Sequence, residues 1–387
     1  MCESKRASIG GLSRLSLPTD WSSPPSADEV EVTLLGRGFG ESVVLHLCDN
    51  DWVVIDSLMS SRRTSAPLDY LLDLGIAPER VRAILATHWH DDHVAGISQL
   101  YKWATGAALA MPIVKNSKEL ISYLAAQEPD GIGQITSGVA ELANLVEIRL
   151  AEGRPAPRHC QADLTLVRKT SAAAGVEITL TALSPLSADL DAFLLQLAGA
   201  SVRGEGVAAR LLPFKPNDVS VATWLAIDDD AVLLGADLEN VASEDRGWKA
   251  VVASDVRPKG RASVYKVAHH GSENAEHPGI WENMLKPRPL AALAPFNKGV
   301  GLPKSTDVQR ILKRTPDAYT TNQTPFRRMR DARPIVLRAL EADHISIRAG
   351  NAEVGRVRMR RKATSGGSPW EVDLSANASH LKNFAAR

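Results

Sequence analysis

Several features that mark common protein classes are scarce or missing in this sequence. Of its 387 residues only three are cysteine, and Cys2, Cys48 and Cys160 lie far apart with no CxxC pair. This spacing excludes a disulfide framework and suits free thiols in a reducing compartment. No stretch has the uninterrupted apolar composition of a signal peptide or a membrane span. A cytoplasmic protein without a membrane partner is therefore expected.

The chain also lacks an excess of charge of either sign. Its 45 basic and 45 acidic residues cancel, so bulk charge indicates neither a nucleic-acid partner nor a membrane surface. A chain of this length can bury a large core, either as one big domain with extensions or as two domains.

Histidine, in contrast, is concentrated. Of the ten histidines, six lie in two short windows, and the others (His46, His159, His344 and His380) are scattered singly. Such bunching is what a metal site assembled from distant loops requires. The two windows contain His88, His90 and His93, and then His269, His270 and His277.

The first window carries the strongest chemical signal. Thr87–Gly96 reads THWHDDHVAG and follows the apolar run Val81–Ala86. Imidazole and carboxylate are ligands of zinc and similar divalent ions. Alternate side chains of an extended segment share a face, so His88 and His90 can bind one ion, while Asp92 and His93 are offset towards a second. A polar loop with Asp92 as helix N-cap is the alternative interpretation.

Four apolar strands are predicted to end in metal-ligand residue types. Asp56 at the end of its strand could bind or orient ligands, or cap a helix. The four segments are Val53–Asp56, the strand Val81–Ala86 with its histidine loop, Leu233–Asp237, and Val264–His270.

Further elements follow from periodicity and turn residues. A Ser- and Pro-rich leader covers residues 1–28. Leu145–Leu150 alternates like a strand. Helices are predicted at Pro67–Leu74, Val94–Trp103, Ser117–Gln127, Gly138–Leu145, Ala188–Leu197 and Thr306–Lys313.

The C-terminal part is basic. Between Phe326 and Lys362 there are eleven Lys or Arg residues against four acids. His344–Arg348 and Val354–Arg360 alternate as two strands of a basic β-hairpin. Such a hairpin could contact phosphate groups, or it could be a solvated edge kept soluble by its charge.

These motifs resemble the metallo-β-lactamase superfamily, whose HxHxDH motif appears here as His88–His93. Within it the chain looks most similar to the soluble hydrolase domain of ComEC-type competence proteins. That closer resemblance covers about residues 30–325. It depends on Asp237 in Gly-Ala-Asp, the run His269-His270-Gly271-Ser272, the segment Asn217–Val221, and Trp248-Lys249-Ala250.

The resemblance implies an αββα four-layer sandwich for a hydrolase domain at 29–325. The basic composition separates from it a C-terminal hairpin extension and tail at 326–387. It implies two divalent ions, zinc or manganese, that activate a water for attack. His88 and His90 would bind one ion, Asp92, His93 and His269 the other, and Asp237 both. Asp56 would orient the histidine loop, and Asp92, Asp237 and His270 would take part in catalysis, with Ser272 or His270 near the substrate.

The chain departs from the superfamily pattern at the third ligand of the first ion. Most members supply a histidine there, and His159 is the only histidine between positions 94 and 236. Asn217 or Asp218 matches the ComEC-like branch better at this place. Asn297 also lacks the His-Pro that usually follows it in that branch. A weaker first site, or a preference for manganese, would result.

The expected function is hydrolysis of a phosphodiester in a nucleic acid or nucleotide. Two alternatives stay open. One is a hydrolase of carbon esters or amides, such as a lactonase, thioesterase or β-lactamase-like enzyme. The other is a metal-binding regulatory module with little turnover.

Overall fold

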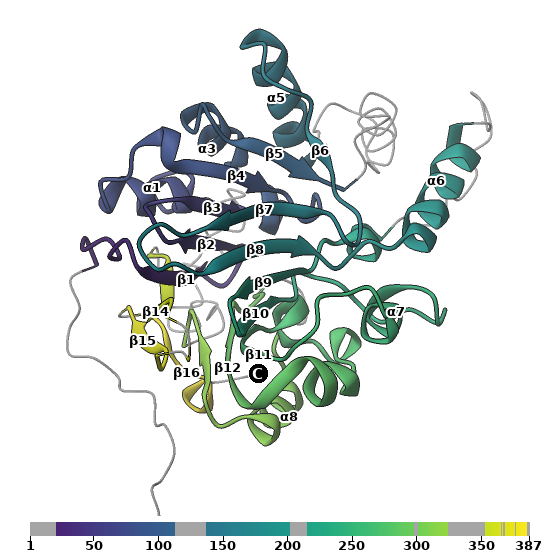
Figure 1. Ribbon diagram of the computed structural model, residues 1–387. Helices are drawn as coiled ribbons and strands as arrows, with labels where there is room; N and C mark the ends of the chain where they lie inside the picture. Colours follow the sequence, from purple (N-terminus) through teal and green to yellow (C-terminus); the bar gives the residue numbers. More distant parts are fainter. Residues whose placement is uncertain are drawn as a thin grey trace, which may run out of the picture.

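The computed structural model describes residues 21–112, 137–201, 215–297, 301–323, 353–364, 366, 368–375 and 377–384. Two β-sheets pack face to face, and helices lie on the outer face of each (Figure 1). This mixed α/β arrangement with two large sheets confirms the predicted fold class.

The first sheet has eight strands within the described residues, in an order that joins the two ends of the chain. β1 pairs antiparallel with both β14 and β2, and β3 to β6 run parallel to one another. The strand order is β15 (Glu371–Leu374), β14 (Gly355–Lys362), β1 (Glu29–Gly36), β2 (Glu41–Leu47), β3 (Trp52–Ile55), β4 (Val81–Leu85), β5 (Ala108–Met111) and β6 (Arg158–His159).

The second sheet likewise has eight strands in the described part of the chain. β10 runs parallel to β11 and antiparallel to β9. The strand order is β16 (Ser379–His380), β13 (Ala318–Thr320), β12 (Leu285–Leu293), β11 (Ala262–Lys266), β10 (Asp230–Leu234), β9 (Thr223–Ile227), β8 (Glu177–Ala182) and β7 (Thr165–Thr170).

The main hydrophobic core lies between the two sheets. Every residue of β2 and β10 is buried, and Leu45 of the first sheet packs in the same cluster as Ile178 and Val232 of the second. Two further clusters pack the helices onto the outer faces. The helices are α1 (Ala66–Asp73), α3 (Ile97–Trp103) and α5 (Ser137–Ala151) on the first sheet, and α7 (Gly247–Ala253) and α8 (Ser305–Arg314) on the second.

Two local predictions were wrong. Residues 145–150 belong to α5 and form no strand, because Leu145 and Ile148, one helical turn apart, both pack on the outer layer of the first sheet. The helix predicted from Val94 to Trp103 is divided at Gly96, whose φ of 79° ends α2 (Asp91–Val94) before α3 begins. The helix predicted at Ser117–Gln127 lies outside the described residues.

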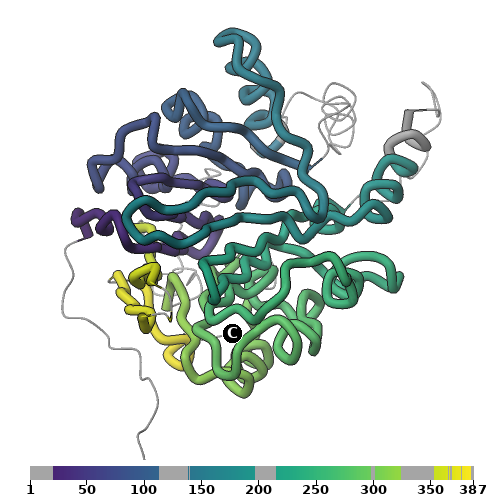
Figure 2. Tube along the Cα trace, in the orientation of Figure 1, coloured from purple at the N-terminus to yellow at the C-terminus, as the bar shows by residue number. Residues whose placement is uncertain are grey.

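The basic C-terminal segment forms part of the first sheet. β14 lies between β1 and β15, with Glu29 opposite Lys362 and Gly36 opposite Gly355. In Figure 2 the yellow C-terminal strands accordingly lie beside the purple start of the chain. Residues 344–348, expected as the other strand of a hairpin, lie outside the described residues.

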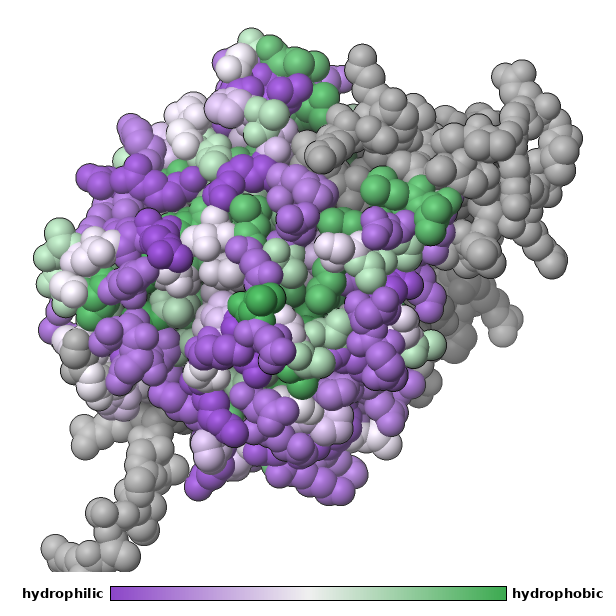
Figure 3. Space-filling model, turned by 45° about the vertical axis from the view of Figure 1, so that its right-hand side comes forward, coloured by the Kyte–Doolittle hydropathy of each residue, from purple (hydrophilic) through white to green (hydrophobic). Residues whose placement is uncertain are grey.

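The outer surface is polar over much of its area. Figure 3 shows one face on which hydrophilic residues surround small, separate apolar patches. In the described part of the chain, no helix combines the length and apolar composition that a membrane span requires.

Candidate metal centre

Four strand ends meet at one edge of the two sheets. β3 and β4 are parallel, so Asp56 and the loop after Leu85 leave the first sheet on the same side. β10 and β11 are also parallel, and Asp237 and His270 follow their ends in the second sheet. The predicted clustering of ligand-type residues is therefore a consequence of strand direction.

Asp92, His93, Asp237 and His270 form a buried cluster, which we call the four-residue group. One ligand atom from each lies within 4.8 Å of all the others. The Nε2 atom of His93 is 3.3 Å from Asp237 Oδ2 and 3.7 Å from Asp92 Oδ2. The Nε2 atom of His270 is 3.2 Å from Asp92 Oδ2 and 3.5 Å from Asp237 Oδ2. Two imidazoles and two carboxylates thus converge on one point.

The hydrogen bonding of this group fits a metal ion. His93 Nε2, His270 Nε2 and Asp237 Oδ1 are buried and make no hydrogen bond of acceptable geometry. Buried polar atoms rarely remain without a partner, and imidazole nitrogen with carboxylate oxygen is a donor set for zinc and related ions. The residues present therefore fit a divalent ion, one of the two that the sequence resemblance implies.

The charges of the group are strongly coupled. Burial alone would lower the pKa of His93, but the carboxylates of Asp237, Asp56 and Asp92 outweigh it and raise that pKa well above its ordinary value. Burial would likewise raise the pKa of Asp237, yet His93 and His270 lower it well below the usual range. A divalent ion would take over this role of positive charge, and protons would compete with it.

His88 and His90 form a second pair of donors beside the group. His88 Nε2 lies 3.1 Å from His90 Nδ1, and the His88 and His93 rings are 4.2 Å apart. Burial and the neighbouring histidines lower the pKa of His88 well below 6.5, so its ring is neutral, as metal binding requires. Thr87 Oγ1 lies 3.0 Å and Ser220 Oγ 3.4 Å from His88 Nδ1, which leaves Nε2 for an ion.

Asp56 lies behind the histidine loop. Its Oδ2 atom is 2.7 Å from His93 Nδ1, and Thr87 donates to both carboxylate oxygens. Such a contact fixes the imidazole tautomer and directs the opposite nitrogen, Nε2, at the cluster. Because Asp56 is fully buried, its pKa is raised despite the contact with His93.

His269 and His270 point in different directions although they are adjacent. Both have left-handed backbone conformations, with φ of 45° and 53°. His270 is buried within the four-residue group. His269 is 17% exposed; its Nε2 lies 3.9 Å from Asp237, and its Nδ1 faces Glu239 at 3.2 Å and Asn274 at 3.1 Å. The predicted role of His269 as a ligand stays a prediction, and the geometry favours His270.

The remaining candidate residues lie around the rim or away from it. Asn217 donates to Glu239 and is 3.5 Å from His269 Nε2. Asp218 pairs with Arg246 at 3.1 Å. Ser272 follows the His269-His270 turn and is partly exposed. His159 lies on β6, separated from β4 by β5, and belongs to neither group of convergent ligands.

Two buried charged residues beside the group escaped prediction from the sequence. Glu41 begins β2 and Lys266 ends β11, and they form an ion pair. Glu41, Asp56 and His93 form a second group whose ligand-type atoms lie close together. The available signal was a lysine inside the apolar run Val264–Ala268, immediately before His269 and His270.

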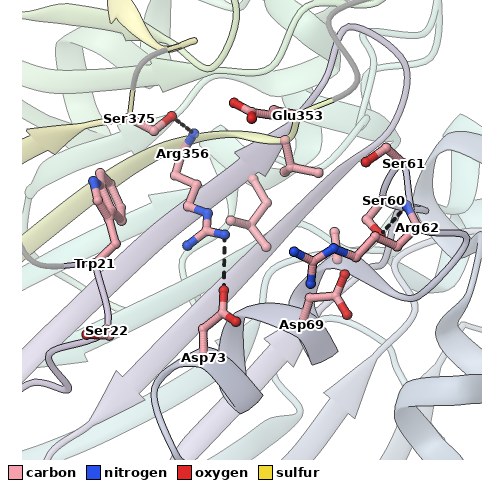
Figure 4. A pocket seen from close by; sticks show the side chains of 13 residues that line it. Trp21, Ser22, Ser60, Ser61, Arg62, Asp69, Asp73, Glu353, Arg356 and Ser375 are labelled. Atoms are coloured by element: carbon pink, nitrogen blue, oxygen red, sulfur yellow. Dashed lines mark hydrogen bonds and ion pairs between the residues drawn. The ribbon is translucent and has the colours of Figure 1, made fainter.

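A separate cavity of about 630 Å³ lies away from the cluster, between α1 and the start of β14 (Figure 4). Arg356 reaches Asp73 across it at 3.4 Å, and Trp21 stands at one side. Its lining mixes both signs of charge, with Arg62 and Arg356 beside Asp69, Asp73 and Glu353, and includes no residue of the four-residue group.

Comparison with known proteins supports the interpretation of residues 35–114. Residues 35–114 match the family model described as Metallo-beta-lactamase superfamily. The matched segment runs from the end of β1 to just past β5 and includes the whole HxHxDH loop. The two sheets with outer helices are consistent with its fold. No curated protein sequence matches the chain.

Several solved structures show weak similarity to the chain. The metallo-beta-lactamase fold protein YhfI from Bacillus subtilis is 15% identical, with 62% of this chain and 70% of that chain covered and a TM-score of 0.32. MEM-A1, a subclass B3 metallo-beta-lactamase from a soil metagenome library, is 17% identical, with 65% of this chain and 83% of that chain covered and a TM-score of 0.34. BJP-1 of Bradyrhizobium japonicum, also a subclass B3 metallo-beta-lactamase, is 15% identical, with 63% of this chain and 78% of that chain covered and a TM-score of 0.35. Likenesses this weak support no conclusion about activity.

Proposed function

We propose that the chain is a metal-dependent hydrolase of the metallo-β-lactamase superfamily. The observation that carries this proposal is the four-residue group, in which buried nitrogen and oxygen atoms converge without hydrogen-bond partners. A site of this kind costs stability in a chain that binds no ion, because each unsatisfied buried polar atom is unfavourable by about 1–3 kcal/mol.

The ligands divide into two sets. Asp92, His93, Asp237 and His270 would hold one divalent ion, zinc or manganese. His88 and His90, with Asp237 as the shared carboxylate, would hold a second. When bound, such ions lower the pKa of water and polarise the bond to be cleaved.

The chain's own residues would orient the reacting groups. Asp56 and Thr87 fix the ring of His93, so its Nε2 atom faces the cluster. His269 lies at the exposed edge of the cluster, beside Asp237 and within reach of Asn217. From there it can hydrogen-bond a substrate and protonate the leaving oxygen.

A phosphodiester is the proposed substrate class, supported by the resemblance of His269–Ser272 and Asn217–Val221 to the ComEC-type branch. Within the described residues of the basic C-terminal segment, strand β14 gives this class little support. Four arginines of β14 pair with acids of the same chain: Arg356 with Asp73, Arg358 with Asp373, Arg360 with Glu31, and Arg361 with Asp230. Their charges are therefore largely neutralised internally. Without support from these arginines, carbon esters, including lactones, stay the second candidate class.

The test is an activity screen of the metal-loaded protein beside Asp92→Ala, with bis-p-nitrophenyl phosphate, DNA, RNA, cyclic nucleotides and lactones as substrates. Turnover of any phosphodiester by the wild type, lost in the variant, supports the proposal. Turnover of lactones alone would show that the substrate class is carbon esters and not phosphodiesters. Metal analysis that finds no bound zinc or manganese after loading contradicts the proposal as a whole.

A further inference from the structure

A buried ion pair crosses between the two sheets directly beside the four-residue group. Glu41 belongs to β2 of the first sheet and Lys266 to β11 of the second, and they are 3% and 2% exposed. Removing two charges from water is costly, and a buried ion pair is weak evidence for stability. Its position next to the cluster suggests another role.

Lys266 contacts the turn that presents Asp237. Its Nζ atom donates to the carbonyl oxygen of Ala236 at 3.0 Å and lies 4.0 Å from Asp237 Oδ1. Ala236 has a φ of 44°, a left-handed conformation that is unfavourable for a residue with a Cβ. Because the ammonium group binds this carbonyl, it helps to hold the strained turn and, with it, the direction of the Asp237 carboxylate.

Glu41 lies behind the two histidines of the group. Its Oε2 atom is 3.5 Å from His270 Nδ1 and its Oε1 atom 3.9 Å from His93 Nδ1. The cavity between Glu41, Lys266 and Asp56 measures about 10 Å³, room for about one water molecule. There is little room for solvent beside the Glu41 carboxylate, and Lys266 is the cation that contacts it.

We propose that Lys266, paired with Glu41, is a positioning residue for metal binding: it holds the Asp237 turn in its binding conformation and prevents Glu41 from acting as a competing carboxylate. This inference rests on the proposed function, since it concerns the same site. It assigns the ion pair to the site's geometry and not to the stability of the fold.

The experiment compares the wild type with Lys266→Met, with the double variant Glu41→Leu/Lys266→Met and with Lys169→Met. The double variant leaves no unpaired charge, so it is expected to fold even where the single one does not. Lys169 is the matched control because it also joins the two sheets, through Asp49 and Asp51. Zn²⁺ affinity and stoichiometry are measured by calorimetry, and ligand geometry by the visible absorption of bound Co²⁺.

The double variant is expected to melt like the wild type but to bind Zn²⁺ about tenfold or more weakly, with a changed Co²⁺ spectrum, as for other residues that orient ligands. Lys169→Met is expected to bind Zn²⁺ like the wild type. A double variant with wild-type Zn²⁺ affinity and Co²⁺ spectrum would overturn the inference and leave the proposed function intact. A wild type that binds no metal would instead overturn the proposed function.

Discussion

Two buried ion pairs join the two sheets at opposite ends of their strands, one between β2 and β11 and the other between β10 and β14, and their surroundings differ. At the far end, Asp230 begins β10 and pairs with Arg361 of β14. Ser263 donates to it, and Lys286 lies 2.8 Å from its other oxygen. At the site end, Glu41 and Lys266 adjoin a cluster of atoms without partners. At the far end both carboxylate oxygens of Asp230 face a cation or a hydroxyl group, whereas the site end adjoins ligand-type atoms that converge on one point.

Breaking the far-end pair should have the largest effect on folding. Asp230→Ala leaves Arg361, which is 5% exposed, without its partner. Removal of one partner of a buried pair costs about 3–5 kcal/mol, so urea unfolding should show a loss of that size. Zn²⁺ affinity of the folded variant should not change; a fall in affinity would show that the two ends are not independent.

Removing a ligand at the site end should have the opposite effect: Zn²⁺ affinity should fall while the fold is kept. Asp237→Ala removes a carboxylate from the four-residue group. Even residues that only orient ligands change metal affinity about 10–100-fold, so calorimetry should show a loss of Zn²⁺ affinity above about a hundredfold. Activity should fall with it, while circular dichroism of the metal-free variant stays like that of the metal-free wild type. Retained affinity would exclude Asp237 as a ligand.

Metal removal should reproduce this contrast without mutation. When the free concentration of an ion is 100 times its Kd, binding stabilises the folded state by about 2.7 kcal/mol. Addition of a chelator should therefore lower the melting temperature of the wild type and of Asp230→Ala, but not that of Asp237→Ala. A chelator effect of equal size in all three proteins would mean that the ion binds elsewhere.

Acid should weaken the far-end pair. Burial would raise the pKa of Asp230, but Lys286 and Ser263 outweigh it and lower that pKa below 3.8. A carboxylate with a lowered folded-state pKa contributes stability above its unfolded value and loses it as pH falls through the folded value. The difference in unfolding free energy between wild type and Asp230→Ala should thus be constant above about pH 5 and shrink below about pH 3.8. A difference that grows on acidification would contradict this.

The smallest effect is expected at a pair that is neither buried nor between the sheets. Arg356 and Asp73 are 23% and 48% exposed and lie 3.4 Å apart at the cavity of Figure 4. Exposed pairs are worth about 0–1 kcal/mol, so Arg356→Gln should cost no more than that in urea unfolding. Zn²⁺ binding should be unaltered, which makes this variant a control for loss of an arginine from β14.

Much of the candidate site could be predicted because its ligands follow apolar strands. Asp56, His88, Asp92 and Asp237 each come shortly after a strand end, where parallel neighbours bring such residues to one edge. Glu41 could not be found in this way. It opens an apolar strand and resembles any polar boundary residue, and its significance comes from Lys266, which lies 225 residues away.

The sequence also could not predict which of His269 and His270 belongs to the four-residue group. Two adjacent histidines carry the same chemical signal, and only the left-handed backbone at both positions decides which ring is buried. The same limit applies to β14. Its alternating pattern indicated a strand, but not that this strand would lie between β1 and β15.

The place of β14 has a consequence for the order in which the molecule can form. Arg360 bonds Glu31 across 329 positions of the chain, so during synthesis β1 emerges long before its partner exists. At about 5–20 residues per second this interval lasts tens of seconds. During that time β1 presents one open edge, a surface to which other strands can add. A nascent chain of this protein is therefore most exposed to aggregation, and most dependent on chaperones, until its last strands leave the ribosome.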